Sequence, residues 1–255
     1  MTGYEEALRR RHRPAHATRT ARSHAAFLLP YLRPGLALLD LGCGPGTITA
    51  GLSDAVAPGP AVGVDLMPGH PDDAPGVRFV AADVTALPFA DASFDAVFAC
   101  CMLQHLADPL AALREARRVA RPGAVIGVVD ADWGGQLMYP NDARLDRALE
   151  VAAGLRPNTS PYVGRQLRSL LAEAGFVRTE GFARVGVDAT SEQTRAVAEF
   201  SAAGYADPAA VERAVHLGLA TADEMAGFAG AWRAWGEHPG AFLARLWCEA
   251  IAFAD

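Results

Sequence analysis

The chain has 255 residues, which is enough for one α/β domain with an added segment or for two small domains. Its 51% hydrophobic residues can bury a complete core, and its net charge of −6 argues against a broad nucleic-acid-binding surface. All 23 basic residues are arginines, so chemistry that needs a lysine, such as Schiff-base formation, is excluded. No apolar run approaches the ~18 residues that span a bilayer. We therefore expect a cytoplasmic protein with neither a nucleic-acid nor a membrane partner.

Neither a disulfide framework nor a metal site is expected. His12 and His16 are four residues apart, but Pro14 between them argues against the helix that would align them as ligands. The cysteines lack the paired spacing of metal ligands and are typical of reduced thiols in a cytosolic protein: Cys43, Cys100, Cys101 and Cys248.

The first 32 residues form a predicted helical cap. Two helical patterns flank Pro14, and the second, over residues 18–32, places small and apolar residues on one face. Pro34 and Gly35 then end the helix, and the first strand is predicted over residues 37–41.

The stretch from residue 38 to residue 49 organises the rest of the chain. Its apolar residues lead into a glycine-rich turn, and a helix is predicted from Thr47 to Val56. A strand, a tight turn and a helix start form the opening unit of a nucleotide-binding α/β sheet. A dinucleotide site would carry its third glycine at position 47, so an NAD(P)-linked oxidoreductase is the less favoured alternative. The glycines stand at alternate positions, where the backbone can turn sharply and approach a ligand: Gly42, Gly44 and Gly46.

Asp40 indicates the charge of the ligand. Its carboxylate stands at the strand end beside the turn, where it would repel a pyrophosphate and attract an ammonium or sulfonium group. At contact range, a partly exposed pair of unit charges contributes roughly 4 kcal/mol before desolvation. S-adenosylmethionine (SAM) carries both cations, and residues 38–49 resemble motif I of the class I SAM-dependent methyltransferases.

The second predicted strand, residues 61–65, ends in an acidic residue. Asp65 follows Gly46 by 19 residues, and an acidic side chain at this place can accept hydrogen bonds from two ribose hydroxyls. The alternative is a turn-forming aspartate, which the spacing and the preceding glycine turn both disfavour. We expect Asp65 and the adjacent Leu66 to bind the cofactor.

A second motif, over residues 87–97, resembles the segment that follows the adenine site in the same family. The resemblance implies that Asp83 hydrogen-bonds the adenine amino group, with the backbone amide of Val84 completing the pair. It also implies that Cys100, at the end of the fourth strand, lies where backbone carbonyls face the methionine end of SAM.

From about residue 38 to residue 132, the chain is similar to the small-molecule branch of these methyltransferases. That branch includes the ubiquinone/menaquinone C-methyltransferases and many enzymes that tailor secondary metabolites. The resemblance implies SAM as the cofactor, methyl transfer as the reaction and a small molecule as the acceptor.

The predicted cap resembles, over residues 16–21 and 25–30, the segment that precedes motif I in one bacterial and fungal subgroup. We expect Arg19 to bind the carboxylate of SAM, because a guanidinium can hold a carboxylate in bidentate fashion and motif I itself offers no cation. The alternative is a solvent-facing arginine among the many of this segment.

His105 is the titratable residue that the pattern places beside the transferred methyl group. It lies five residues past Cys100, at the sheet edge where cofactor and acceptor must meet. Because imidazole titrates near neutrality, His105 could take a proton from an acceptor hydroxyl or ring nitrogen. The alternative is that His105 orients its loop or packs against the cofactor.

The whole pattern predicts a Rossmann-like, doubly wound α/β fold with a mostly parallel seven-stranded sheet. A fifth strand is predicted over residues 124–129, a sixth over 177–187 and an edge strand over 242–253. The predicted domains are the helical cap (1–32), the SAM-binding core (33–189 and 243–255) and a helical lid (190–242).

Aromatic residues after the cofactor half predict an acceptor pocket, although each of them could equally be a core residue. Flat apolar pockets suit aromatic or polyketide-like acceptors, such as an indole or a phenolic ring, methylated on carbon, oxygen or nitrogen. A non-catalytic SAM-binding protein is a further alternative. The predicted acceptor contacts are Trp133, Tyr139, Tyr205 and Trp232.

Overall fold

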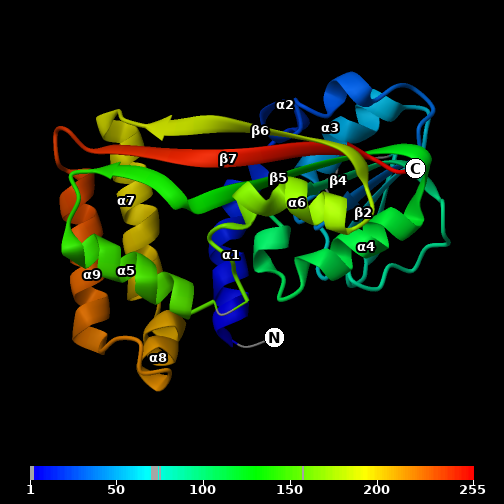
Figure 1. Ribbon diagram of the computed structural model, residues 1–255. Helices are drawn as coiled ribbons and strands as arrows, with labels where there is room; N and C mark the ends of the chain where they lie inside the picture. Colours follow the sequence, from blue (N-terminus) through cyan, green and yellow to red (C-terminus); the bar gives the residue numbers. More distant parts are fainter. Residues whose placement is uncertain (1–2, 70–73, 75, 157) are drawn as a thin grey trace. The chain divides into compact units, whose positions relative to one another are not determined.

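The computed structural model describes residues 3–69, 74, 76–156 and 158–255 (Figure 1). They divide into two compact units. The helical unit comprises Met1–His12, Trp133–Pro161 and Val185–Leu246. The sheet unit comprises Arg13–Asp132, Tyr162–Arg184 and Trp247–Asp255. The division into cap, core and lid stays a prediction.

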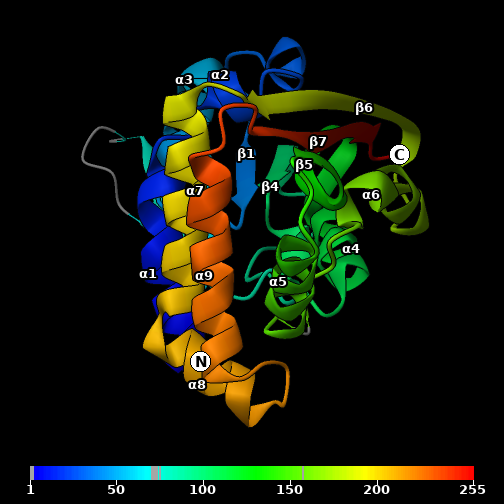
Figure 2. The same cartoon turned by 90° about the vertical axis from the view of Figure 1, so that its left-hand side faces the viewer.

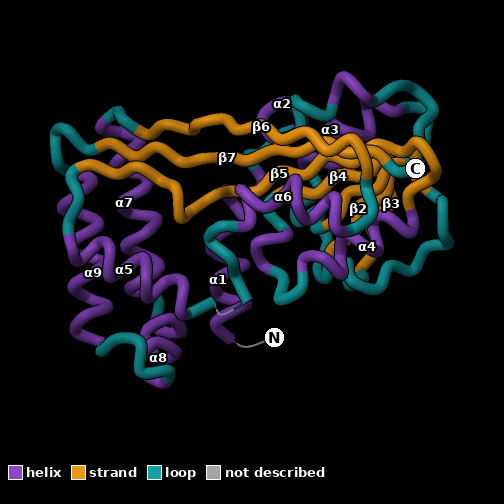
Figure 3. Tube along the Cα trace, in the orientation of Figure 1, coloured by secondary structure: helices purple, strands orange, loops and turns teal. Residues whose placement is uncertain are grey.

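In the described residues, seven strands form one sheet in the order β3-β2-β1-β4-β5-β7-β6, and this confirms the predicted fold class (Figure 3). The pairs β3-β2, β2-β1, β1-β4 and β4-β5 are all parallel. The strands are β1 (Leu38–Leu41), β2 (Ala61–Asp65), β3 (Val77–Ala81), β4 (Phe94–Cys100), β5 (Ala120–Tyr139), β6 (Val177–Asp188) and β7 (Phe242–Phe253).

Side chains of the parallel strands alternate between two buried faces. Leu38 and Phe98 belong to one apolar cluster, together with Leu52 of α3. Leu39 and Val97, one position along each strand, belong to the opposite cluster with residues of α4 and α6. Helices therefore cover both faces, as a doubly wound sheet requires. They are α3 (Thr47–Val56), α4 (Pro109–Val119) and α6 (Val163–Glu173).

The last strand is not an edge strand, and the expectation from the sequence is wrong on this point. β7 lies between β5 and β6, so the edge belongs to β6. Burial agrees with this order, because Ala250, Ile251 and Ala252 of β7 are buried while no described residue of β6 is. Strand order is set by long-range pairing, which the local pattern of residues does not record.

β5 is also longer than the predicted strand over residues 124–129. It continues to Tyr139 through Asp130 and Asp132, which resemble loop residues in the sequence. Both aspartates are buried and bound: Asp130 accepts from a backbone N–H, and Asp132 pairs with Arg165. Hydrogen bonds and an ion pair thus offset the burial of two acidic side chains.

The N-terminal segment differs from its predicted helices. The helix α1 (Gly3–Ala17) contains Pro14, so the expected break there is absent. The predicted helix over residues 18–32 is instead the short α2 (Ala21–His24), followed by a 3₁₀ turn at Leu29–Tyr31. Pro30 lacks the N–H that a continuing helix would need.

Four helices of the helical unit share a separate apolar cluster. Figure 2 shows α7 and α9 side by side, and Tyr205 of α7 packs edge-on against Phe228 of α9 with ring centroids 5.7 Å apart. No helix in the described part of the chain is both long and apolar enough to cross a membrane. The helices are α5 (Ala143–Gly154), α7 (Ser191–Ala206), α8 (Pro208–His216) and α9 (Ala222–Gly236).

Candidate cofactor site

The turn between β1 and α3 depends on glycines in the left-handed region. Gly42 has φ of +70°, and a Cβ there would lie 2.5 Å from Cγ of Met102. Gly44 has φ of +52°, and the nearest atom to a Cβ there is 4.0 Å away. A side chain at Gly44 would fill open space beside the loop, which is where a ligand can approach the backbone. Gly46, with φ of +87°, caps α3.

Asp65, at the end of β2, is hydrogen-bonded to this loop. Its Oδ2 accepts from the Gly44 N–H at 3.1 Å, and its Oδ1 accepts from the Met67 N–H at 2.9 Å. The residue predicted to bind ribose therefore lies within hydrogen-bond distance of the loop predicted to hold the cofactor. Its contact with ribose stays a prediction.

Asp40 is buried on β1, only 2% exposed, and its Oδ2 accepts a hydrogen bond of 2.5 Å from Thr49 Oγ1. Burial raises the pKa of Asp40 to about 7, against the lowering effect of the Thr49 bond and with a smaller raising effect from Asp65. A nearby cation favours the ionised form of such a carboxyl group. The attraction of Asp40 for a cationic ligand stays a prediction, and the structure adds Thr49 as the residue that holds the side chain.

The residues predicted around adenine lie after β2 and β3, which are neighbours in the sheet. Asp83 is exposed, and its Oδ1 accepts from Thr85 N at 2.8 Å and from Thr85 Oγ1 at 2.7 Å. These bonds lower the pKa of Asp83 and keep it ionised. Val84 is buried, whereas Leu66 is 56% exposed beside Asp65. Their roles toward adenine stay predictions.

The carboxyl ends of β4 and β5 carry buried titratable groups. Cys100 ends β4, and its Sγ donates to Sγ of Cys101 at 3.7 Å. That bond and burial raise the pKa of the Cys100 thiol. Asp130 of β5 is 1% exposed and accepts from the N–H groups of Gln104 and Ala131, each at 3.1 Å. Burial raises the pKa of Asp130 well above its usual range, and Cys101 adds to the effect.

Arg19 lies half-buried within the sheet unit rather than facing solvent. Its Cζ is 5.6 Å from the ring centroid of Trp247. Burial, followed by the charge of Arg19, lowers the pKa of His16 to about 4, and Asp65 acts weakly in the opposite direction. Trp247 is therefore a neighbour of the site that no sequence motif indicates, whereas His16 begins the segment that resembles the cap preceding motif I. The bond from Arg19 to a carboxylate stays a prediction.

His105 ends a 3₁₀ turn, Leu103–His105, and is exposed. The residue before it, Gln104, is 4% exposed, and its N–H donates to Asp130. The turn is thereby anchored to the end of β5, with His105 on its outer side. The role of His105 as a base stays a prediction. Asp130, which follows the predicted fifth strand at the edge where ligands bind in such sheets, is a second titratable group beside this turn.

The four predicted acceptor contacts fall into two groups. Trp133 and Tyr139, on β5, are 39% and 59% exposed. Tyr205 and Trp232 are buried in the helical unit, and Tyr205 Oη donates to the Ala148 carbonyl at 2.8 Å. This packing favours the core alternative for the two buried residues, and an acceptor contact stays a prediction for all four.

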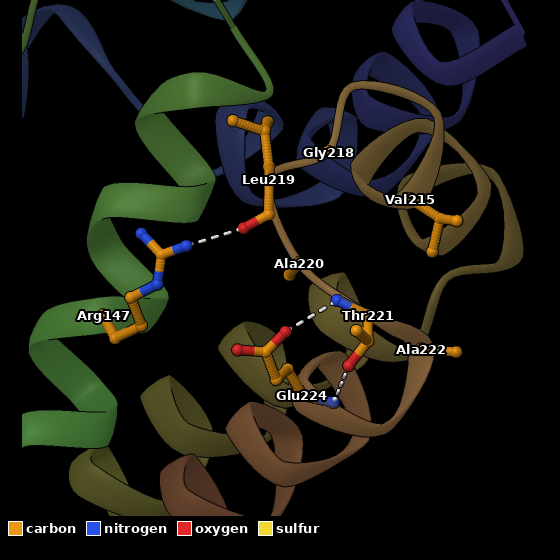
Figure 4. A pocket seen from close by; sticks show the side chains of 8 residues that line it. All are labelled: Arg147, Val215, Gly218, Leu219, Ala220, Thr221, Ala222 and Glu224. Carbon is orange, nitrogen blue, oxygen red and sulfur yellow. Dashed lines mark hydrogen bonds between the residues drawn. The ribbon is translucent and has the colours of Figure 1, made fainter.

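A hollow of about 460 Å³ lies in the helical unit, between α5 and the start of α9. Figure 4 shows the residues that line it. Arg147 donates to the Leu219 carbonyl at 2.7 Å, and Thr221 and Glu224 bind each other in a capping box. These polar groups are hydrogen-bonded within the protein, so they leave few donors or acceptors in the hollow to orient a ligand.

Comparison with known proteins agrees with the fold. A family model described as a methyltransferase domain matches residues 39–128. The Probable methyltransferase ltbC of Aspergillus luteorubrus is 30% identical over 92% of this chain and 92% of its own length. The 27-O-demethylrifamycin SV methyltransferase of Amycolatopsis mediterranei is 34% identical over 54% of each chain.

In two further relatives, this chain spans less than two thirds of the relative's own length. An uncharacterized 37.1 kDa protein from a Streptomyces fradiae transposon is 37% identical over 62% of this chain, which spans 49% of that protein. An uncharacterized methyltransferase of Schizosaccharomyces pombe is 33% identical over 64% of each chain.

Solved structures show the same fold. The YcgJ protein of Bacillus subtilis has a TM-score of 0.57 at 17% identity, over 90% of this chain and 97% of its own. The Haemonchus contortus phosphoethanolamine N-methyltransferase 2, in complex with S-adenosylhomocysteine and phosphomonomethylethanolamine, has a TM-score of 0.53 at 15% identity, over 90% and 52%. A Rossmann-like sheet with a glycine loop tied to an acidic strand end is the architecture of a nucleotide-binding α/β protein. The chain belongs to the class I SAM-dependent methyltransferase family, and its cofactor is SAM.

Proposed function

We propose that this protein transfers the methyl group of SAM to a small-molecule acceptor of aromatic or secondary-metabolite type. The observation that carries the proposal is the bond from Gly44 to Asp65, which joins the motif I loop to the acidic end of β2. Membership of the methyltransferase family supports the reaction, and the rifamycin relative supports the class of acceptor. The exposed rings of Trp133 and Tyr139 offer flat apolar surface for such a molecule.

Methyl transfer requires the protein to align the acceptor with the methyl group of SAM and to exclude water from both. When bound, SAM supplies a methyl group that its sulfonium has already activated. The glycine loop and Asp65, which are hydrogen-bonded to each other, would hold the cofactor, and the carboxyl group of Asp40 would stabilise its positive charge. Holding donor and acceptor in a near-attack geometry can lower the barrier by ~7–11 kcal/mol.

Proton removal depends on the acceptor atom. A hydroxyl or ring nitrogen must lose a proton, and His105 at the end of its anchored turn is the group assigned to accept it. An electron-rich ring carbon attacks before it loses its proton, so alignment matters most for it. Methylation on oxygen, nitrogen or carbon therefore makes different demands on the same residues.

Equilibrium binding separates the cofactor alternatives. Calorimetric titration of the purified chain with S-adenosylhomocysteine and with NAD should show binding of the first and none of the second. Asp65→Ala should lose the binding, and Asp54→Ala, which removes an exposed acid from α3, should keep it. Binding of NAD alone would favour an oxidoreductase instead.

An acceptor screen tests the reaction itself. The chain is incubated with SAM carrying a deuterated methyl group and with phenols, hydroquinones, indoles and polyketide hydroxyls, and the products are read by mass spectrometry. We expect label in at least one of these classes. Label only in small polar acceptors such as glycine would contradict the proposed acceptor class, and binding without any transfer would favour a non-catalytic SAM-binding protein.

A further inference from the structure

Two arginine side chains lie over the indole ring of Trp247. The ring, on β7, is half-buried, and its centroid is 5.6 Å from Cζ of Arg19 and 5.1 Å from Cζ of Arg184. His24 of α2 packs edge-on against the same ring at 5.1 Å. A cation is attracted to an aromatic face, but two like charges on one ring repel each other. An anion between them would relieve that repulsion.

Arg184 has hydrogen-bonding capacity that the described part of the chain does not use. Its Nε donates to Oε1 of Glu249 at 2.7 Å. Its Nη2 is buried and has no hydrogen-bond partner among the described residues. A buried guanidinium N–H without an acceptor is costly, so this nitrogen suits an acceptor that a ligand brings. Trp247 and Glu249 are two residues apart on β7 and so share one face, where Glu249 holds Arg184 over the ring.

The charges around the ring are predominantly positive. Burial, followed by the charges of Arg19, Arg184 and His16, lowers the pKa of His24 to about 4. The hydrogen bond from Cys100 lowers the pKa of Cys101, and the charges of both arginines add to that effect. The two arginines therefore act on one place, the end of β4, where the family resemblance puts the methionine end of SAM.

The net charge selects the kind of anion. Glu249 neutralises one of the two guanidinium groups, and burial raises the pKa of Asp130, which makes that carboxyl group harder to ionise. One positive charge remains, which matches a single carboxylate better than a phosphate dianion. A planar carboxylate also fits the planar fork of a guanidinium.

We propose that Arg19 and Arg184 form, over the indole of Trp247, a binding site for one carboxylate group. The proposal rests on the proposed function and adds Arg184 to the residues predicted from the sequence. The carboxylate has two sources in a methyl-transfer reaction, the amino-acid part of SAM or an acidic acceptor. The chemistry of recognition is the same for both, so the experiment must tell them apart.

The variants are Arg184→Gln and the double variant Arg184→Gln with Glu249→Gln. The double variant removes both partners of the ion pair, so no buried acid is left alone if the single variant fails to fold. Arg178→Gln is the matched control, because Arg178 also extends from β6 over an aromatic ring of β7, with Cζ 4.2 Å from the Phe253 centroid. The probes are S-adenosylhomocysteine, its decarboxylated analogue, and benzoate added to protein saturated with S-adenosylhomocysteine.

Calorimetry on these proteins gives distinct results for the two sources. If the site takes the cofactor's carboxylate, the Arg184 variants bind S-adenosylhomocysteine roughly tenfold or more weakly than the control does. The decarboxylated analogue then binds to the Arg184 variants and to the control with equal affinity. If it takes an acceptor's carboxylate, S-adenosylhomocysteine affinity is unchanged, and benzoate binds to the control but not to the Arg184 variants. Either result supports the site.

The proposal is overturned if the double variant binds all three probes as the Arg178→Gln control does. That result leaves the methyltransferase proposal intact, because the transfer of labelled methyl groups tests it separately. If wild-type protein binds neither S-adenosylhomocysteine nor benzoate, both proposals fail. Benzoate binding without S-adenosylhomocysteine binding would keep the carboxylate site and contradict only the methyltransferase proposal.

Discussion

The backbone N–H of Gly44 donates to Oδ2 of Asp65 across 3.1 Å, and this bond ties the loop after β1 to the end of β2. Two residues that are 21 positions apart thus form one structural element of the cofactor site. The Met67 N–H binds the other carboxylate oxygen, so the side chain also shapes the turn that follows β2. Asp65 therefore combines a positioning role toward the loop with its predicted contact to ribose.

Asp65→Ala should weaken S-adenosylhomocysteine binding by roughly ten- to a hundredfold. Hydrogen bonds to a charged acceptor contribute about 1.5–3 kcal/mol each, and this change removes the acceptor from both loop and ligand. Titration calorimetry measures the affinity, and Asp54→Ala on the exposed side of α3 is the control. An unchanged dissociation constant would remove Asp65 from the cofactor site.

A pair of helical glycines should respond in opposite directions to alanine. A Cβ at Gly51 of α3 would lie 2.9 Å from Cβ of Ala21 in α2, so Gly51→Ala forces the two helices apart. Overpacking of this kind costs about 1–3 kcal/mol of unfolding free energy. At Gly227 of α9, no atom of the described residues outside the adjoining helix backbone lies within 4 Å of a Cβ, and Gly227→Ala should stabilise by about 0.5–1 kcal/mol. Urea denaturation measures both, and changes of equal sign would contradict the packing of α2 on α3.

Local signals account for the parts of the fold that the sequence predicts well. The helix expected from Thr47 to Val56 has those bounds in the structure, because glycines precede it and a Pro-Gly-Pro stretch follows it. The glycine loop and Asp65 meet as their spacing predicts, since parallel neighbouring strands end at one edge of the sheet.

The parts that the sequence does not predict depend on contacts between distant segments. Trp247 reaches Arg19 and Arg184 because β7 pairs between β5 and β6, and no local pattern records that order. The sequence places Asp130 after the end of the predicted fifth strand. The structure shows that it lies within β5 and accepts a hydrogen bond from the backbone N–H of Gln104. Long-range pairing and burial decided these features, and a single sequence carries only weak signals for either.

Asp40 should make stability depend on pH. Burial raises its pKa from the usual 3.8 to about 7, so between these values the folded protein keeps a proton that the unfolded chain has released. The free energy of unfolding therefore falls as pH rises through this window, by up to about 1.4 kcal/mol per pH unit from this group. Asp40→Asn removes the dependence while an amide oxygen can still accept from Thr49.

Denaturation of wild-type and Asp40→Asn proteins across pH 4 to 7 tests this expectation. The stability of the variant relative to wild type should rise steadily with pH across this range. Asp54→Asn serves as control, because it makes the same chemical change at an exposed position of α3. A constant difference for Asp40→Asn would show that the buried carboxyl titrates at its ordinary pKa.

His105→Ala should lower kcat by about 10²–10⁴ if His105 accepts the acceptor's proton, with the affinity for S-adenosylhomocysteine unchanged. The acidic limb of the kcat profile should disappear as well, because protonation of the imidazole is what stops the base in wild-type protein. The exposed His216 of α8 gives a matched control, since His216→Ala removes an imidazole from the helical unit. If the His105→Ala variant keeps near-normal turnover and the acidic limb, His105 has only a structural role in the turn, which the bond from Gln104 to Asp130 anchors. The acceptor atom would then be an electron-rich carbon, which needs to be held in line with the methyl group before any proton is lost.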